Sequence, residues 1–217
     1  MTAPLYLRPS VQACAVRDDL VLLDAADDAY LCIPQGAVTL DWRPQTRSFA
    51  PSDPGAAAEL LDAGLVQLLP AQPWLAEPPN APTRGLSPAP PPRLDFAGQR
   101  ALAGAWLDLL RDYRDRRFAE ILAKVRRTSP SVLQPTEELE KLAASFLQAM
   151  VWAPAPGKCL ARSFLLLRAL QRSGHDCAWV FGVRTWPFGA HCWLQVGDLA
   201  LDEAPERLAP YQPICAA

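Results

Sequence analysis

The chain has 217 residues, of which half are hydrophobic and a fifth are charged, a balance typical of one large folded domain or two small ones. A formal net charge of −2 excludes the broad basic field that binding to nucleic acid or to a membrane surface uses. No run reaches the roughly 18 apolar residues of a transmembrane helix, and the first residues lack a secretory signal pattern, so we expect a cytoplasmic protein without a membrane partner.

The first 70 residues have the pattern of a small β-rich module. Three β-rich runs, at 11–16, 20–25 and 29–33, are separated by polar residues and predict a three-stranded antiparallel meander. Asp53 and Pro54 predict the N-cap and first residue of a helix over 54–63, which Gly64 ends. Residues 65–70 are expected to form a short strand or wing. A structure of this size suits a binding module, and we assign it residues 1–70.

Residues 71–93 are crowded with Pro, of which the whole chain has 23. Pro lacks a backbone N–H and fixes φ, so this segment cannot form a helix interior or a central strand. We predict an extended, partly polyproline linker there, and a second domain over residues 94–217.

The second domain is helical at first and β-rich afterwards. Helical spacing extends from Leu102 to Val125, and a second helix is predicted to open at Thr136. A third helix is predicted over 159–173, and strands over 177–185, 190–196 and 199–202, the last two joined by a tight turn at Gly197-Asp198. Helices followed by an antiparallel sheet predict an α+β architecture.

The spacing and number of the cysteine and histidine residues argue against a metal site. The six Cys show no CxxC spacing and the chain has only two His, so we expect free thiols, no metal and no cofactor. The cysteines are Cys14, Cys32, Cys159, Cys177, Cys192 and Cys215.

Cys159 is the candidate nucleophile. It follows the sequence PAPGK and opens a predicted helix, where unpaired amide groups and the helix dipole stabilise a thiolate. The amide of Cys159 could also face a developing oxyanion. From its position alone, a buried structural Cys is the competing interpretation.

His191 and Asp202 are the candidate partners of Cys159. His191 begins a strand from which an imidazole can take the thiol proton and return it to a leaving amine. Asp202, on the hairpinned strand, is placed to hold the imidazole, whereas Glu203 is expected to face the opposite side. Asp198 is the rival acid but occupies the turn, and His175 is expected to be structural.

The motifs at these residues resemble the lasso-peptide biosynthesis B proteins of the transglutaminase-like cysteine protease superfamily. The family's C-L-x-R-S start corresponds to Cys159, Leu160, Arg162 and Ser163, and its G-V-R-x-x-P-F-x-A-H-x-W block runs from Gly182 to Trp193. The Asp of the family's third motif corresponds to Asp202. The sequence departs from the family at Cys192, where a small residue such as Ala is common.

The resemblance implies a transglutaminase-like, papain-like α+β domain with a catalytic triad of Cys159, His191 and Asp202. The implied function is cleavage of the leader from a ribosomally made lasso-peptide precursor, followed by ring closure by an ATP-dependent, asparagine-synthetase-like cyclase. By pattern, the first 70 residues resemble a PqqD-like winged-helix precursor-recognition element, in which the leader adds as a strand to the sheet edge and packs on the helix. The residues expected to bind it are Tyr30, Leu31, Cys32, Ile33, Leu60 and Leu61.

Two other functions stay open from the sequence. A precursor-binding adaptor with a degenerate second domain would use the first module alone. A Cys acyltransferase would use the same three residues but would pass the acyl group to an amine instead of water.

Overall fold

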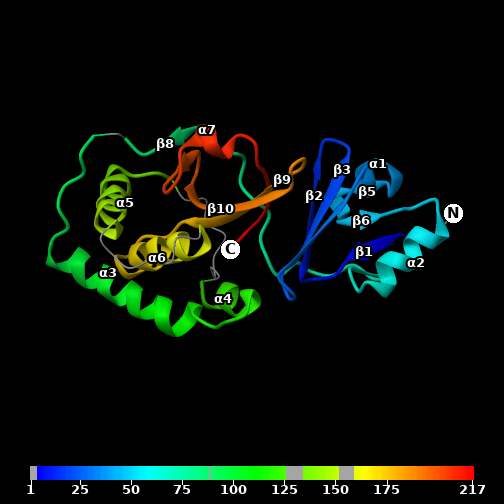
Figure 1. Ribbon diagram of the computed structural model, residues 1–217, viewed down its shortest axis with the longest axis horizontal. Helices are drawn as coiled ribbons and strands as arrows, with labels where there is room; N and C mark the ends of the chain where they lie inside the picture. The colour runs from blue at the N-terminus through cyan, green and yellow to red at the C-terminus, as the bar shows by residue number, and fades with distance from the viewer. Residues whose placement is uncertain (1–3, 88, 126–133, 152–158) are drawn as a thin grey trace.

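The computed structural model describes residues 4–87, 89–125, 134–151 and 159–217, which form two lobes along one long axis (Figure 1). The N-terminal lobe runs from β1 (Leu5–Leu7) to β7 (Val66–Gln67) and the C-terminal lobe from α3 (Phe96–Asp108) to β12 (Gln212–Ala216). The strands form three sheets, ordered β2-β3-β4, β5-β6-β1-β7 and β12-β9-β10-β11-β8. Helices and sheets are mixed, in agreement with the predicted α+β class.

The predicted meander of the N-terminal lobe is present. Its strands are β2 (Val11–Val16), β3 (Asp19–Asp24) and β4 (Ala29–Ile33), paired antiparallel in sequence order. The predicted helix is α2 (Pro54–Asp62), and the Asp53 side chain caps it by accepting from the Gly55 N–H. The lobe also holds short elements that we did not predict: β1 (Leu5–Leu7), α1 (Gly36–Thr39), β5 (Trp42–Arg43), the 3₁₀ turn η1 (Pro44–Thr46) and β6 (Ser48–Phe49). The predicted 65–70 strand shortens to β7 (Val66–Gln67).

Strand β3 is buried on both faces, which explains its nearly continuous apolar sequence. Side chains alternate between the faces of a strand. Leu20 and Leu22 pack into the core of the N-terminal lobe, whereas Val21 and Leu23 pack into the main core of the C-terminal lobe. The meander is therefore the layer that both lobes share.

The C-terminal lobe places helices against a five-stranded sheet. The helical part comprises α3 (Phe96–Asp108), the π-helix η2 (Leu109–Tyr113), α4 (Phe118–Val125), α5 (Glu137–Met150) and α6 (Cys159–Arg172). The Thr136 side chain caps α5, as predicted. The sheet contains β8 (Arg84–Gly85), β9 (Ala178–Arg184), β10 (Gly189–Val196), β11 (Leu199–Ala200) and β12 (Gln212–Ala216), with the short helix α7 (Pro205–Leu208) before β12. We predicted β9, β10 and β11 but not α7 or β12.

The Pro-rich segment 71–93 is extended, but it is attached to the C-terminal lobe and is not a free tether. Leu75 is buried, and Ala76 forms a β-bridge with Ala216 near the end of the chain. Further along, β8 pairs in parallel with β11, and Arg84 forms an ion pair with Asp198. The segment that we predicted as an extended linker is therefore held against the five-stranded sheet at Ala76 and at β8.

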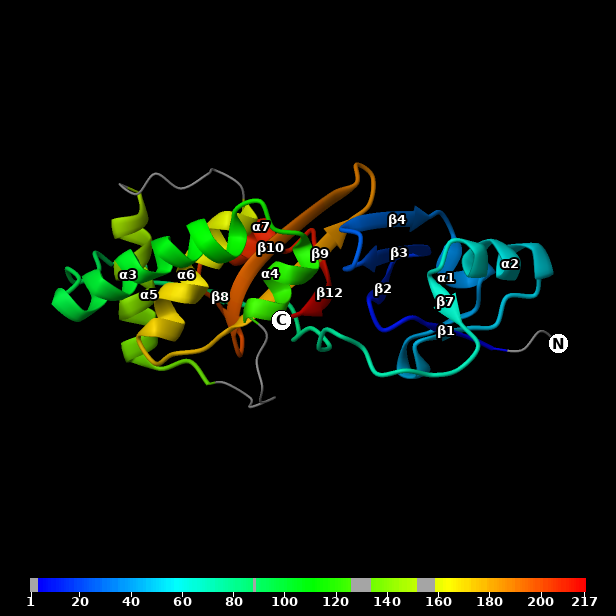
Figure 2. The same ribbon diagram turned by 90° about the horizontal axis from the view of Figure 1, so that it is seen from below.

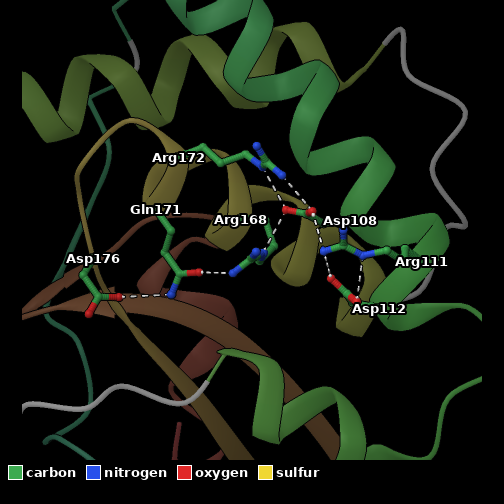
Figure 3. Close-up of polar contacts among 7 residues, drawn as sticks. All are labelled: Asp108, Arg111, Asp112, Arg168, Gln171, Arg172 and Asp176. Atoms are coloured by element: carbon green, nitrogen blue, oxygen red, sulfur yellow. Dashed lines mark hydrogen bonds and ion pairs between the residues drawn. The ribbon is translucent and has the colours of Figure 1, made fainter.

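A charged cluster joins α3 to α6, the helix that begins at Cys159 (Figure 3). The side chain of Asp108 is only 2% exposed and accepts hydrogen bonds from Arg168 at 3.0 Å and twice from Arg172 at 2.8 Å. Gly104 leaves the space for this contact, because a Cβ there would lie 2.7 Å from the Arg172 guanidinium. The cluster fixes α6 against its neighbour.

Candidate active site

The Cys159 thiol lies at the start of α6, beside the part of β10 that does not pair with β11. It is in hydrogen-bond contact with the Cys192 thiol, the His191 side chain and the Cys192 backbone N–H. The structure therefore brings Cys159 and His191 together, as the sequence predicted. Cys192, noted only as a departure from the family pattern, is a direct neighbour of the sulfur.

β11 ends early, and this leaves one edge of β10 unpaired beside the Cys159 sulfur. β11 pairs with β10 only at Gln195–Ala200 and Val196–Leu199. Beyond this point, Leu194 N–H donates to the Asp202 carboxylate at 2.8 Å, and two residues earlier the Cys192 N–H faces Cys159. Alternate amides of a strand point to the same side, so both groups use positions that a longer β11 would occupy.

The surroundings of Cys159 favour a thiolate–imidazolium pair. Hydrogen bonds from the Cys192 and His191 side chains lower the pKa of Cys159 to about 4, against the opposing effect of burial. The pKa of His191 is raised, mainly by its hydrogen bond to Cys159. Contact with the Cys159 sulfur and burial raise the pKa of Cys192, which stays protonated as a donor. A thiolate held beside an imidazolium is the reactive form of a nucleophilic cysteine.

Aromatic rings hold the His191 imidazole in place. Its centroid lies 5.4 Å from that of Tyr211 and 6.5 Å from that of Trp193. Gly182 of β9 pairs with His191 of β10, and a Cβ on Gly182 would lie 2.7 Å from the Trp193 ring. Glycine at this position therefore allows the rings to close around the imidazole.

The acid that contacts His191 is Glu203. Its Oε2 lies 3.5 Å from His191 Nε2, and both side chains are largely buried. Asp202 instead accepts from the Ser163 hydroxyl at 2.5 Å and from the Leu194 N–H at 2.8 Å. It is close enough to act on the imidazole electrostatically, but the described residues include no hydrogen bond between them.

Glu203 was expected to face away from His191, and its contact with the imidazole corrects that expectation. Side chains alternate between two faces only where a regular strand continues through them. β11 ends at Ala200, and the chain bends over residues 201–203, which turns Asp202 to the edge of β10 and Glu203 to the imidazole. The sequence signal that could have identified Glu203 is the adjacent pair of acids, Asp202 and Glu203. Both stay candidates when no strand register is assumed for residues 201–203.

Replacing Glu203 by Gln is expected to lower the kcat of a reaction at Cys159 on the order of 10²-fold. The KM for its substrate should change little, because the loss affects only the charge that orients the imidazolium. Asp202→Asn is the matched variant, and it should mainly lower the melting temperature, since Asp202 bonds to Ser163 and Leu194. Kinetics and thermal unfolding of both variants test this. A larger loss of kcat in Asp202→Asn would return the role to Asp202.

The alkylation rate of Cys159 by iodoacetamide is expected to follow a midpoint near pH 4, because only the thiolate reacts and its pKa is lowered to about 4. The rate should be nearly constant at neutral pH and fall as acid protonates the sulfur. Peptide mapping by mass spectrometry measures the rate at Cys159 separately from the other thiols. A midpoint near the ordinary thiol value of about 8.5 would contradict the ion pair.

The predicted leader-binding residues are divided between surface and core. β4 lies at the edge of its sheet, and Leu31 in β4 and Leu61 in α2 are 43% and 39% exposed. Leu60 is 5% exposed and packs in the core of the N-terminal lobe, so it is not available to a peptide. The Tyr30 side chain packs against the main core of the C-terminal lobe.

The other titratable candidates lie away from the sulfur. Asp198 is in the exposed turn, as expected, and binds Arg84 and Thr83. His175 follows the end of α6 at the opposite end from Cys159, with Nε2 4.0 Å from Glu138.

A cysteine at a helix start, with a histidine and an acid on the adjoining sheet region, agrees with the family assignment. Residues 103–216 match the transglutaminase-like superfamily, and the chain belongs to it. A stretch of 47 residues is 43% identical to the microcin J25-processing protein McjB of Escherichia coli, and covers 22% of this chain and 23% of McjB. The chain therefore matches about a quarter of that relative's length. No solved structure matches the chain.

The superfamily match begins after the N-terminal lobe, so the winged-helix assignment of that lobe stays a prediction. No helix among the described residues is long and apolar enough to cross a membrane.

Proposed function

We propose that the protein is a cysteine peptidase that cuts the leader from a lasso-peptide precursor, with Cys159 as nucleophile and His191 as general acid and base. The observation that carries the proposal is the hydrogen-bonded pair of Cys159 and His191 at the mouth of α6. Glu203 is the proposed positioning residue, in place of Asp202. The similarity to McjB, whose name describes the processing of microcin J25, supports the substrate class.

The proposed reaction has two halves. The Cys159 thiolate attacks the carbonyl carbon at the leader–core junction, and the amide nitrogen leaves as an amine after taking the proton from His191. The leader is then held as a thioester. His191 next removes a proton from water, the resulting hydroxide attacks the thioester, and Cys159 is restored as the thiolate.

The proposed substrate binds through its leader at the free edge of β4. An extended peptide added there would gain main-chain hydrogen bonds, and the exposed Leu31 and Leu61 would contact its side chains. The released core would pass to an ATP-dependent, asparagine-synthetase-like cyclase, a partner proposed from the family resemblance.

Incubating the purified full chain with a candidate lasso precursor peptide tests the proposal. Mass spectrometry should detect a leader fragment with a free carboxylate and a core with a free amine. The assay is repeated with hydroxylamine as a competing acceptor. Release that requires hydroxylamine, with the leader recovered only as the hydroxamate and none as the free carboxylate, would indicate an acyltransferase, and binding without any release would indicate an adaptor.

A further inference from the structure

Arg184 is a partly buried cation on the same hairpin as the proposed catalytic base. It ends β9, and the hairpin carries His191 on β10 and extends to β4 of the N-terminal lobe (Figure 2). The described residues include every Asp and Glu of the chain, and none of these acids forms an ion pair with Arg184. Its Nε is buried and has no hydrogen-bond acceptor among the described residues. A buried donor without a partner is unusual in a native fold and requires an explanation.

An aromatic ring and a glycine position the Arg184 guanidinium. Its central carbon, Cζ, lies 5.3 Å from the centroid of the Tyr211 ring. Gly189 of β10 pairs with Arg184 of β9, and a Cβ on Gly189 would lie 2.9 Å from Arg184 Nε. The arginine can therefore extend over β10 only because residue 189 has no side chain. A ring face holds a cation in place without neutralising its charge.

Tyr211 also contacts the proposed base. Its ring lies 5.4 Å from the His191 imidazole, centroid to centroid. Residues two apart on a strand face the same side of the sheet, so His191 projects from the face of β10 on which Arg184 crosses Gly189. The guanidinium, the ring and the imidazole therefore follow one another along one face.

The nucleophile lies toward the opposite face of this sheet. Cys192 follows His191 on β10 and packs, like Cys159, with the main core of the C-terminal lobe. Tyr211 packs instead with a smaller cluster of buried residues on the other face. The imidazole thus contacts the sulfur on one side and the Tyr211 ring on the other. Seen from the sulfur, Arg184 lies beyond the base.

The acid beside the base does not neutralise Arg184. One oxygen of Glu203 lies 3.5 Å from His191 Nε2, and the other lies 3.4 Å from Arg207 Nη1, so both are engaged elsewhere. The two terminal nitrogens of Arg184 have no partner among the described residues and, unlike its Nε, are not buried. These nitrogens are the donors that a ligand can reach.

We propose that Arg184 binds a carboxylate of the substrate peptide, so that the site favours a precursor with an acidic side chain in the first residues after the cleaved bond. This inference rests on the proposed peptidase function. His191 gives its proton to the leaving amine, so the part of the peptide that lies beyond His191 from the sulfur is the released core. A guanidinium suits this ligand because its N–H groups match the two oxygens of a carboxylate.

Phenylglyoxal labelling of the full chain tests the carboxylate site without a precursor. This reagent modifies accessible guanidinium groups, and peptide mapping by mass spectrometry gives the rate at each arginine. N-acetyl-aspartate amide, whose only charge is its side-chain carboxylate, is expected to slow the modification of Arg184 several-fold and in a saturable manner. N-acetyl-asparagine amide has nearly the same shape without the charge and should have no effect.

Arg100 is the matched control within the same experiment. Its guanidinium carbon lies 6.0 Å from the centroid of the Phe96 ring, but the residue is exposed and lies on α3, away from the hairpin. Equal protection of Arg100, no protection of Arg184, or no modification of Arg184 at all would overturn the proposal. The labelling result is independent of catalysis: protection of Arg184 without precursor cleavage would keep the carboxylate site and reject the peptidase.

A precursor that the wild-type protein cleaves gives a second test. The acidic residues of its core are replaced one at a time by their amides. One of these replacements is expected to raise KM about tenfold with little change in kcat, because it removes an interaction made equally in the bound and transition states. In Arg184→Gln the same replacement should have no further effect, since the charge that it would contact is already absent.

Arg184→Lys keeps the charge but not the paired N–H groups, so it should keep a weaker preference for the acidic precursor. Circular dichroism confirms that each variant is folded. If Arg184→Gln instead lowers kcat equally for all precursors, the arginine only supports Tyr211 and His191, and the proposal fails. Additive effects of the Arg184→Gln and precursor changes would also overturn it, while leaving the peptidase function intact.

Discussion

Cys159→Ala is expected to abolish precursor cleavage, with a loss in kcat of at least about 10⁴-fold. Alanine cannot form the thioester, and His191 alone has no nucleophile to activate. The free leader and core are quantified by mass spectrometry over a time course long enough to detect that residual rate. The variant should still bind the precursor, because the β4 edge lies on a different element from Cys159.

Cys14→Ala is the control for losing a thiol elsewhere. Burial raises the pKa of Cys14 to about 12, so it carries no thiolate at neutral pH. This variant should cleave at nearly the wild-type rate. Leader release that persists unchanged in Cys159→Ala would remove the proposed nucleophile, and with it the peptidase mechanism.

Asp108→Ala is expected to lower the free energy of unfolding by about 3 kcal/mol, because it leaves Arg168 and Arg172 without their shared partner. The value is at the low end for a broken buried pair, since Arg172 is 41% exposed and can return to water. Chemical denaturation followed by circular dichroism measures the change.

Arg111→Ala provides the comparison on the same cluster. Arg111 is 71% exposed and bonds mainly to Asp112, so its loss should destabilise the fold much less than the loss of Asp108. Equal destabilisation by both substitutions would contradict the central place of Asp108.

The elements that the sequence predicted carry their own local signals. Asp53 and Thr136 are side-chain caps, the Gly197-Asp198 turn closes a hairpin, and the apolar runs of β2, β3 and β4 lie between short polar turns. Each of these signals lies within a few residues of the structure that it specifies, so one sequence is enough to read it.

Several of the elements that were not predicted are short strands that pair with distant parts of the chain. β1 pairs with β6 and β7, which lie about 40 to 60 residues away, and β8 pairs with β11 more than 110 residues later. Two- and three-residue strands have too few side chains to show a period, so their existence depends on partners that folding brings to them.

The candidate site was predicted in part. Cys159 and His191 were identified from a helix start and a strand start, and the structure places them in contact. The choice between Asp202 and Glu203 depended on the residue at which β11 stops, which no local pattern marks. The packing of Tyr30 against the C-terminal core depends on how the two lobes meet, which the spacing of residues within one lobe does not reveal.

The two-sided burial of β3 makes the N-terminal lobe and the C-terminal lobe one thermodynamic unit. Pulling them apart would expose Val21 and Leu23 to water, together with the apolar residues of the C-terminal lobe that they cover. Heat should therefore melt the chain in a single cooperative transition. Selection on this chain would act on both lobes jointly, since a substitution that loosens one lobe also loosens the other.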